Sequence, residues 1–232
     1  MRRLVRHCFK RSILAGALFA LLLAPGRIMA TVLNPGGSVT NPASSAAPSG
    51  LILATTGPVN VESPGFFSGT VTSSVLADAS NPFGSNDLTF TYEFDYTGWD
   101  HNFVNTDVIS RITVSPYAPP ENPVTYSTDA RWSTVSGGVS LAVINRPGTG
   151  DAVGFSWALS PLGHGKIGLG GNSNLLVVYT NATQYMTGNV SIIGTGTLET
   201  PSFAPAPEPS TFVMLGLGIV SLFGYCLRKR FG

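Results

Sequence analysis

Six side chains with acid–base or ligand chemistry lie within one short stretch of the sequence, FTYEFDYTGWDHNFVNTD. They are Glu93, Asp95, Trp99, Asp100, His101 and Asp107. In an alternating strand Glu93 and Asp95 fall on the same polar face, and residues 100–107 are expected to form a loop at the end of that strand. Oxygen-rich loops of this kind can hold Ca²⁺, although the spacing matches neither an EF-hand nor a nonapeptide repeat. Solvated carboxylates on an exposed face explain the pattern equally well.

The same stretch has two further interpretations. Trp99, together with the aromatic residues beside it, can form a platform for a sugar ring, although aromatic residues at strand ends are more often part of a core. A glycosidase needs two carboxylates about 5–10 Å apart across a cleft, and Asp95 with Asp107 is the pair to check. We predict a protein that is not an enzyme and has no catalytic residue, metal or cofactor. Sugar binding and a Ca²⁺ ion are the alternatives.

Two motifs suggest other chemistry but lack the context that this chemistry needs. GHGKIGLGG contains G-x-G-x-x-G at Gly163, Gly165 and Gly168, yet more glycine, asparagine and a strand follow instead of a helix. Lys166 precedes Ile167, so the stretch is not a P-loop either. Ser156 in GFSWA resembles a nucleophile elbow but lies inside an alternating strand. We therefore predict no nucleotide site at the glycine cluster and no hydrolase with Ser156 as its nucleophile.

Alternation of apolar and polar residues predicts an all-β domain. In LTFTYEFDY (88–96), five apolar residues fall on one side, and similar short segments bounded by turn residues follow along the chain. They span residues 66–76, 108–114, 124–132, 139–144, 152–159, 175–180 and 190–198. This spacing favours antiparallel sheets packed as a β-sandwich or jelly roll over residues 51–200. Residues 31–50 are predicted to be a loosely ordered lead-in and residues 201–210 a proline-rich linker.

Charge and cysteine usage divide the chain into a middle and two ends. Between residues 31 and 206 there are four basic residues and eleven acidic ones, so the near-neutral total is an average over two basic ends and an acidic middle. An acidic middle repels phosphate backbones, which argues against nucleic-acid binding. The two cysteines, Cys8 and Cys226, also lie in the ends. The middle segment therefore contains no disulfide.

The N-terminal end has the pattern of a secretory signal peptide. Basic residues up to Arg11 precede an uncharged apolar run from Ile13 to Ala24, which is too short to span a bilayer comfortably. The helix breakers Pro25 and Gly26 follow, and cleavage is predicted after the small residue Ala30. The alternative is a signal anchor that is not cleaved.

The C-terminal end combines three features in order. The triplet Pro207, Glu208 and Pro209 is followed by Ser210, then by an apolar segment predicted as a transmembrane helix over 211–227, and last by the basic residues of 228–232. The apolar segment is near the lower limit of about 17 residues for a spanning helix. Arg228, Lys229 and Arg230 are expected to hold the C-terminus on the cytoplasmic side.

These three features resemble a PEP-CTERM sorting signal. The resemblance implies a Gram-negative bacterium that produces exopolysaccharide, and an exosortase that recognises the tail and acts near Pro-Glu-Pro. It also implies an exported protein that is first anchored in the inner membrane and later located at the cell surface or in the extracellular matrix. We therefore expect a non-enzymatic structural or adhesive protein associated with exopolysaccharide or biofilm. The main alternative is a carbohydrate-binding module, and a secreted glycosidase is the third.

Overall fold

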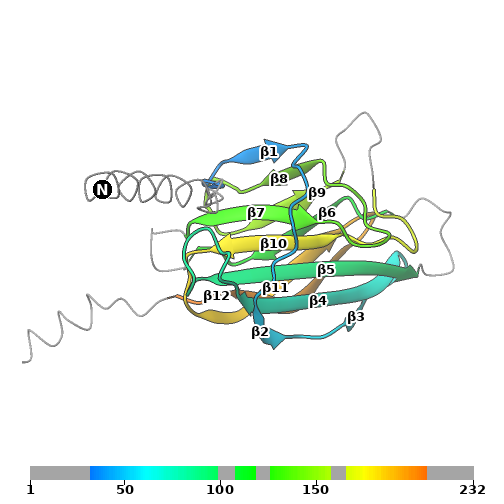
Figure 1. Cartoon of the computed structure of the whole chain (residues 1–232). Helices are drawn as coiled ribbons and strands as arrows, with labels where there is room; N and C mark the ends of the chain where they lie inside the picture. Colours follow the sequence, from blue (N-terminus) through cyan, green and yellow to red (C-terminus); the bar gives the residue numbers. More distant parts are fainter. Residues whose placement is uncertain (1–31, 99–107, 119–125, 158–165, 208–232) are drawn as a thin grey trace, which may run out of the picture.

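The computed structural model describes residues 32–98, 108–118, 126–157 and 166–207, which form strands and no helix (Figure 1). The strands are β1 Ser38–Thr40, β2 Leu51–Thr55, β3 Val59–Ser63, β4 Phe67–Ala77, β5 Leu88–Gly98, β6 Arg111–Ser115, β7 Thr128–Ser133, β8 Val143–Asn145, β9 Val153–Ser156, β10 Leu175–Thr180, β11 Tyr185–Ile193 and β12 Thr197–Pro205. The predicted all-β class is confirmed. The predicted signal peptide, its cleavage point Ala30 and the predicted transmembrane helix lie outside the described residues. Within those residues, no helix has the length and apolar character to cross a membrane.

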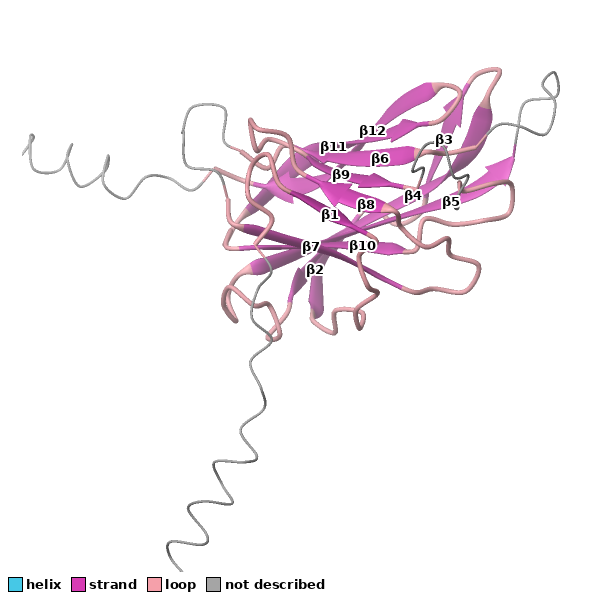
Figure 2. Ribbon diagram, turned by 90° about the horizontal axis from the view of Figure 1, so that it is seen from above, coloured by secondary structure: helices cyan, strands magenta, loops and turns pink. Residues whose placement is uncertain are grey.

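The strands form two antiparallel sheets that stack as a β-sandwich (Figure 2). One sheet has the order β1-β8-β9-β6-β11-β12, and we call it sheet A. The other, sheet B, has the order β2-β4-β5-β10-β7, with β3 pairing along β4 beyond β2. The predicted segment 190–198 is divided between two strands, because the turn at Gly194–Gly196 closes the β11–β12 hairpin.

The strongest predicted strand is a central element of sheet B. β5 lies between β4 and β10, and the five apolar side chains of its inner face are all buried. They are Leu88, Phe90, Tyr92, Phe94 and Tyr96. A fully buried Phe side chain contributes about 2–3 kcal/mol relative to an exposed one, so this face is a main source of the core's stability. Four aromatic residues outside β5, Trp132, Phe155, Trp157 and Tyr179, are also buried.

The sandwich extends beyond the predicted limits of 51–200 on both sides. Within the predicted lead-in, β1 pairs with β8, and residues 41–50 cross the outer face of sheet B from β7 to β2 (Figure 1). The amide of Ser45 donates to the Trp132 carbonyl (2.8 Å), because β7 is an edge strand with free carbonyl groups. Within the predicted linker, β12 pairs with β11 as far as Pro205, since an edge strand can accommodate proline.

The loops gather at two opposite ends of the sandwich. The junction end consists of residues 32–37, 78–87, 116–118, 126–127, 146–152, 181–184 and 206–207, and both termini of the described domain leave from it (Figures 1 and 2). The far end consists of the loops 64–66, 108–110, 134–142, 166–174 and 194–196 and the final residues of β5. This polarity decides where each candidate functional residue lies.

Candidate functional site

Two members of the predicted acidic cluster lie on β5, on the outer face of sheet B and toward the far end. Glu93 is half-buried and Asp95 is exposed. Burial raises the pKa of the Glu93 carboxyl, and repulsion by Asp95 raises it further. The other four members, Trp99, Asp100, His101 and Asp107, lie outside the described residues. Cross-strand neighbours Thr72 and Thr70 add hydroxyl-bearing side chains to the face.

The far-end loop that follows β9 comes back alongside β5. Asp95 forms a β-bridge with Asn172, which also bridges to Gly138. Two far-end loops, the one that contains Gly138 and the one that contains Asn172, therefore lie next to the acidic face. Carboxylate, amide and hydroxyl groups in such an arrangement can hydrogen-bond to sugar hydroxyl groups. In the described ranges, no group of three or more His, Cys, Asp or Glu side chains is placed to hold a metal ion.

The remaining sequence motifs have structural surroundings. Ser156 ends β9, and its hydroxyl accepts a hydrogen bond from Arg111 Nη1 (3.0 Å). The glycine-rich stretch continues, after the part outside the described residues, as a β-bridge between Ile167 and Ile109 and a turn at Gly168–Gly171. In the described parts of both segments, up to Trp157 and from Lys166 on, there is no strand-to-helix turn of the kind that nucleophile elbows and dinucleotide sites require.

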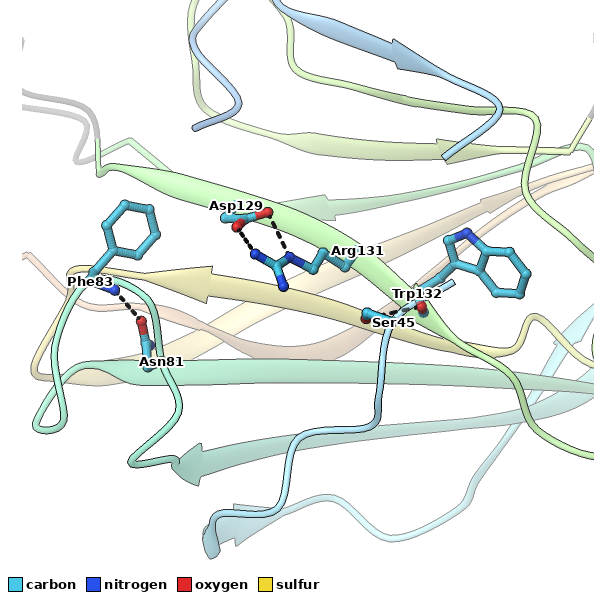
Figure 3. Close-up of polar contacts among 6 residues, drawn as sticks. All are labelled: Ser45, Asn81, Phe83, Asp129, Arg131 and Trp132. Carbon is cyan, nitrogen blue, oxygen red and sulfur yellow. Dashed lines mark hydrogen bonds and ion pairs between the residues drawn. The ribbon is translucent and has the colours of Figure 1, made fainter. Parts of the chain in front are cut away.

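The ion pair on the outer face of sheet B was not predicted from the sequence. Arg131 Nη2 lies 2.6 Å from Asp129 Oδ2, and both residues belong to β7 (Figure 3). The Arg131 guanidinium also lies 5.3 Å from the centre of the Tyr179 ring on β10. The Asp129 side chain is almost fully buried. The hydrogen bond to Asp129 raises the pKa of Arg131. The contact of Arg131 with the Tyr179 ring joins β7 to β10, and the ion pair lies near the crossing segment that contains Ser45 (Figure 3).

Arg146 is the centre of a buried polar network at the junction end. Only 2% of the residue is exposed, although arginine is rarely buried. Its guanidinium donates to four backbone carbonyls and one hydroxyl, at distances between 2.8 and 3.2 Å. The acceptors are the carbonyls of Leu33, Tyr117, Tyr126 and Gly150 and the hydroxyl of Thr128. Burial lowers the pKa of Arg146, but an arginine keeps its proton at neutral pH.

Two buried tyrosines connect this network to β12. The hydroxyl groups of Tyr92 and Tyr117 lie 2.7 Å apart, and the Tyr92 hydroxyl donates to the Phe203 carbonyl (2.6 Å). Burial raises the pKa of both phenols. The Phe203 amide donates to Ser73 Oγ on β4 (3.1 Å). Both backbone polar groups of Phe203 are therefore bonded to side chains of sheet B.

Ala206, which comes directly before the Pro-Glu-Pro triplet, is hydrogen-bonded to the sandwich through both its backbone groups. The Tyr126 hydroxyl donates to the Ala206 carbonyl, and the Ala206 amide donates to the Gln184 carbonyl (3.0 Å). Pro207 is exposed, and Glu208, Pro209 and Ser210 lie outside the described residues. We use the term junction network for Arg146, Tyr126, Tyr117, Tyr92 and Ser73. Because Arg146 bonds to both Leu33 and Tyr126, this network joins the first residues of the described domain to the last.

Sequence reasoning missed the junction network for an identifiable reason. The alternation placed Tyr92 on the inner face, and a buried phenol needs a hydrogen-bond partner, but the pattern does not say which one. Arg146 precedes Pro147 and Gly148, so the sequence indicated only a turn at this position.

Comparison with known proteins identifies the segment that follows the network. The family model described as the PEP-CTERM protein-sorting motif matches residues 205–230. The match starts at the last residue of β12 and includes the Pro-Glu-Pro triplet and the basic residues Arg228, Lys229 and Arg230. No curated protein and no solved structure matches the chain. The predicted PEP-CTERM resemblance is therefore confirmed.

Proposed function

We propose that this PEP-CTERM protein is exported as a membrane-anchored precursor and processed by exosortase. After processing it serves as a non-enzymatic structural or adhesive component at the cell surface or in the matrix, where it is associated with exopolysaccharide. In this proposal, exosortase acts near Pro207–Ser210 and delivers the sandwich as an intact domain. The sorting segment directs the protein to the cell surface or matrix, and the sandwich is the part that remains there after cleavage.

The position of the junction network carries this proposal. β12 is hydrogen-bonded along its whole length to β11, and Ala206 is held by Tyr126 and Gln184. The sorting segment is thus attached directly to the last strand, and its first exposed residue is Pro207. Cleavage beyond Ala206 leaves all twelve strands of the described domain in place.

The use of charged and phenolic groups in the fold supports a structural role. Arg146 donates its hydrogen bonds mainly to backbone carbonyls, and Arg131 donates to Asp129. Tyr92 and Tyr117 do the same in the core. Buried polar networks whose members are all satisfied make a domain rigid and define one native arrangement. Such a rigid domain is suited to remain folded outside the cell.

The test follows the protein in the bacterium that produces it. A strain expressing the full chain is compared with one whose Glu208 is replaced by Ala and with one that lacks the exosortase. We expect the mature sandwich in the matrix fraction of the first strain and uncleaved precursor in the membrane fraction of the exosortase-free strain. Loss of floc or biofilm cohesion after deletion of the gene would support the structural role. Unchanged cohesion together with a new enzymatic activity of the mature protein would contradict it.

Carbohydrate binding at the far end is the second candidate function, and the acidic face of β5 favours it. Glu93 and Asp95 project from one face beside Asn172, an arrangement that can hydrogen-bond to a sugar. The mature protein would then co-sediment with exopolysaccharide, and the double variant Glu93→Gln/Asp95→Asn would bind less. Binding that is unchanged in the double variant would exclude this face.

A further inference from the structure

Both ends of the described domain lie at the same end of the sandwich. Leu33 donates its amide hydrogen to the Thr128 carbonyl (2.7 Å), and Ala206 is held by Tyr126 two residues away along the chain from Thr128. Arg146 contacts the carbonyls of both Leu33 and Tyr126, so the two chain ends share one network. Both views show the two ends of the described domain at the junction end (Figures 1 and 2).

Covalent geometry limits how far the sandwich can be from the membrane in the precursor. Four residues lie between Ala206 and Thr211, where the apolar segment of the sorting motif begins, so the chain takes five Cα-to-Cα steps from one to the other. A fully extended chain spans at most about 3.5 Å per residue, so this connection reaches no further than about 18 Å. The eleven-residue strands β4 and β5 are each about 36 Å long at 3.3 Å per residue. The tether is therefore about half as long as the domain.

We infer that the precursor stands end-on on the membrane, with the junction end against the lipid headgroups and the far end, with Glu93 and Asp95, directed away from the bilayer. This inference rests on the proposed function, because it requires the membrane-anchored precursor. The partner surface is the headgroup layer of the bilayer that holds the apolar segment.

The exposed side chains of the junction end suit this contact. Most are uncharged hydrogen-bonding groups, and Tyr185 is 40% exposed beside them on β11. Tyrosine is enriched at membrane–water interfaces, where its ring sits at the level of the headgroups. Among the described residues of this end, the exposed uncharged residues with hydrogen-bonding side chains are Asn34, Ser80, Ser85, Asn86, Thr149, Asn181, Thr183 and Gln184, while Asp151 is an exposed acid and Asp87 a half-buried one.

The outer face of sheet B is less suited to lie on the membrane. It carries Glu93 and Asp95, and anionic headgroups repel carboxylates. Exopolysaccharide in the surrounding space would meet this acidic face first. End-on attachment therefore separates the side that exosortase approaches from the side that a ligand can reach.

The absence of cysteine between the two ends makes the orientation directly measurable. In the full chain with Cys8 and Cys226 replaced by Ser, one threonine is changed to cysteine and labelled with a fluorophore. Thr183→Cys reports on the junction end, and Thr97→Cys and Thr197→Cys, both exposed at the far end, are the matched controls. The precursor is reconstituted into vesicles of phosphatidylethanolamine and phosphatidylglycerol that carry a headgroup-attached quencher. Asn34→Cys replaces Thr183→Cys if the latter does not fold.

We expect quenching at Thr183→Cys several-fold stronger than at either far-end position. Equal quenching at both ends, or stronger quenching at the far end, would overturn the end-on orientation. The fraction of precursor that floats with the vesicles is measured in the same samples. A precursor that does not float would instead contradict the anchored precursor of the proposed function.

Discussion

The two ends of the sandwich use polar side chains in opposite ways. At the junction end, Arg146 and the tyrosines are buried, and their hydrogen bonds go to backbone groups of the same domain. At the far end, Glu93 and Asp95 lie on an outer face, and partial burial together with repulsion by Asp95 raises the pKa of Glu93. The first arrangement stabilises the fold, whereas the second keeps charge available to solvent and ligands. The position of a polar or charged residue in the sandwich therefore decides its role: those buried at the junction end stabilise the fold, and those on the outer face at the far end are candidates for ligand binding.

Replacement of Arg146 by Ala is expected to have the largest effect on this comparison. It leaves four carbonyls and a hydroxyl without their donor in a buried site, and each such group costs about 1–3 kcal/mol. Because water and relaxation recover part of that cost, we expect a loss of about 3–5 kcal/mol in the free energy of unfolding, measured by urea denaturation. Arg111→Ala is the control, since Arg111 is half-buried on the outer face of sheet A and donates to hydroxyls only. Equal losses for the two variants would remove the distinction between the ends.

The second prediction concerns alkaline pH. Burial raises the pKa of Tyr92 and Tyr117 above that of a free phenol, so the folded state retains their protons where the unfolded state loses them. Stability is therefore fully present below about pH 10, the pKa of an unperturbed tyrosine, and falls as the pH rises above it. Unfolding curves measured from pH 8 to 11 should show this decrease.

The matched variant for the alkaline decrease is Tyr92→Phe. At pH 7 it removes the bonds to Phe203 and Tyr117 and should cost about 1–2 kcal/mol. Above pH 10 its stability should fall less steeply than that of the wild type. A slope identical to the wild type would show that Tyr92 is not a source of the alkaline sensitivity.

The third prediction places a limit on processing. Tyr126→Phe removes the hydroxyl that holds the Ala206 carbonyl, at a cost of about 1 kcal/mol, and should loosen the end of β12. Mass spectrometry of the mature wild-type protein should find a C-terminus at or beyond Pro207. In the variant we expect faster conversion of precursor in pulse–chase experiments. A wild-type C-terminus inside β12 would show that the strand is not protected.

The smallest effect is expected at the far end. Because the folded pKa of Glu93 is raised, the charged form destabilises the fold above that pKa, and protonation at lower pH relieves the effect. Glu93→Gln should therefore be slightly more stable than the wild type at pH 7, by a few tenths of a kcal/mol after solvent screening, and the difference should disappear at acid pH. Thermal unfolding at pH 7 and pH 3.5 measures it. A loss of stability at pH 7 would assign Glu93 to the structural groups.

Local patterns predicted the strands more accurately than the limits of the domain. Residues 175–180 form β10 with the predicted bounds, and β5 exceeds its predicted bounds by two residues, because alternation over a buried face repeats every second residue. Residues 38–40, 51–55, 59–63 and 201–205 were missed as strands. Each of these segments has five residues or fewer, which is too short for a clear period-two signal, and each depends on pairing with β8, β4 or β11.

The sequence by itself determined the all-β class, the inner face of β5 and the sorting motif, because each depends on residues that are close together in the chain. Only the tertiary structure decided the junction network. Its hydrogen bonds join residues that are 80 positions apart at Tyr126 and Ala206, 111 at Tyr92 and Phe203, and 113 at Leu33 and Arg146. A period of two residues carries no information over such separations. The packing of the two sheets therefore chose which polar groups meet, and it placed them beside the segment that directs export.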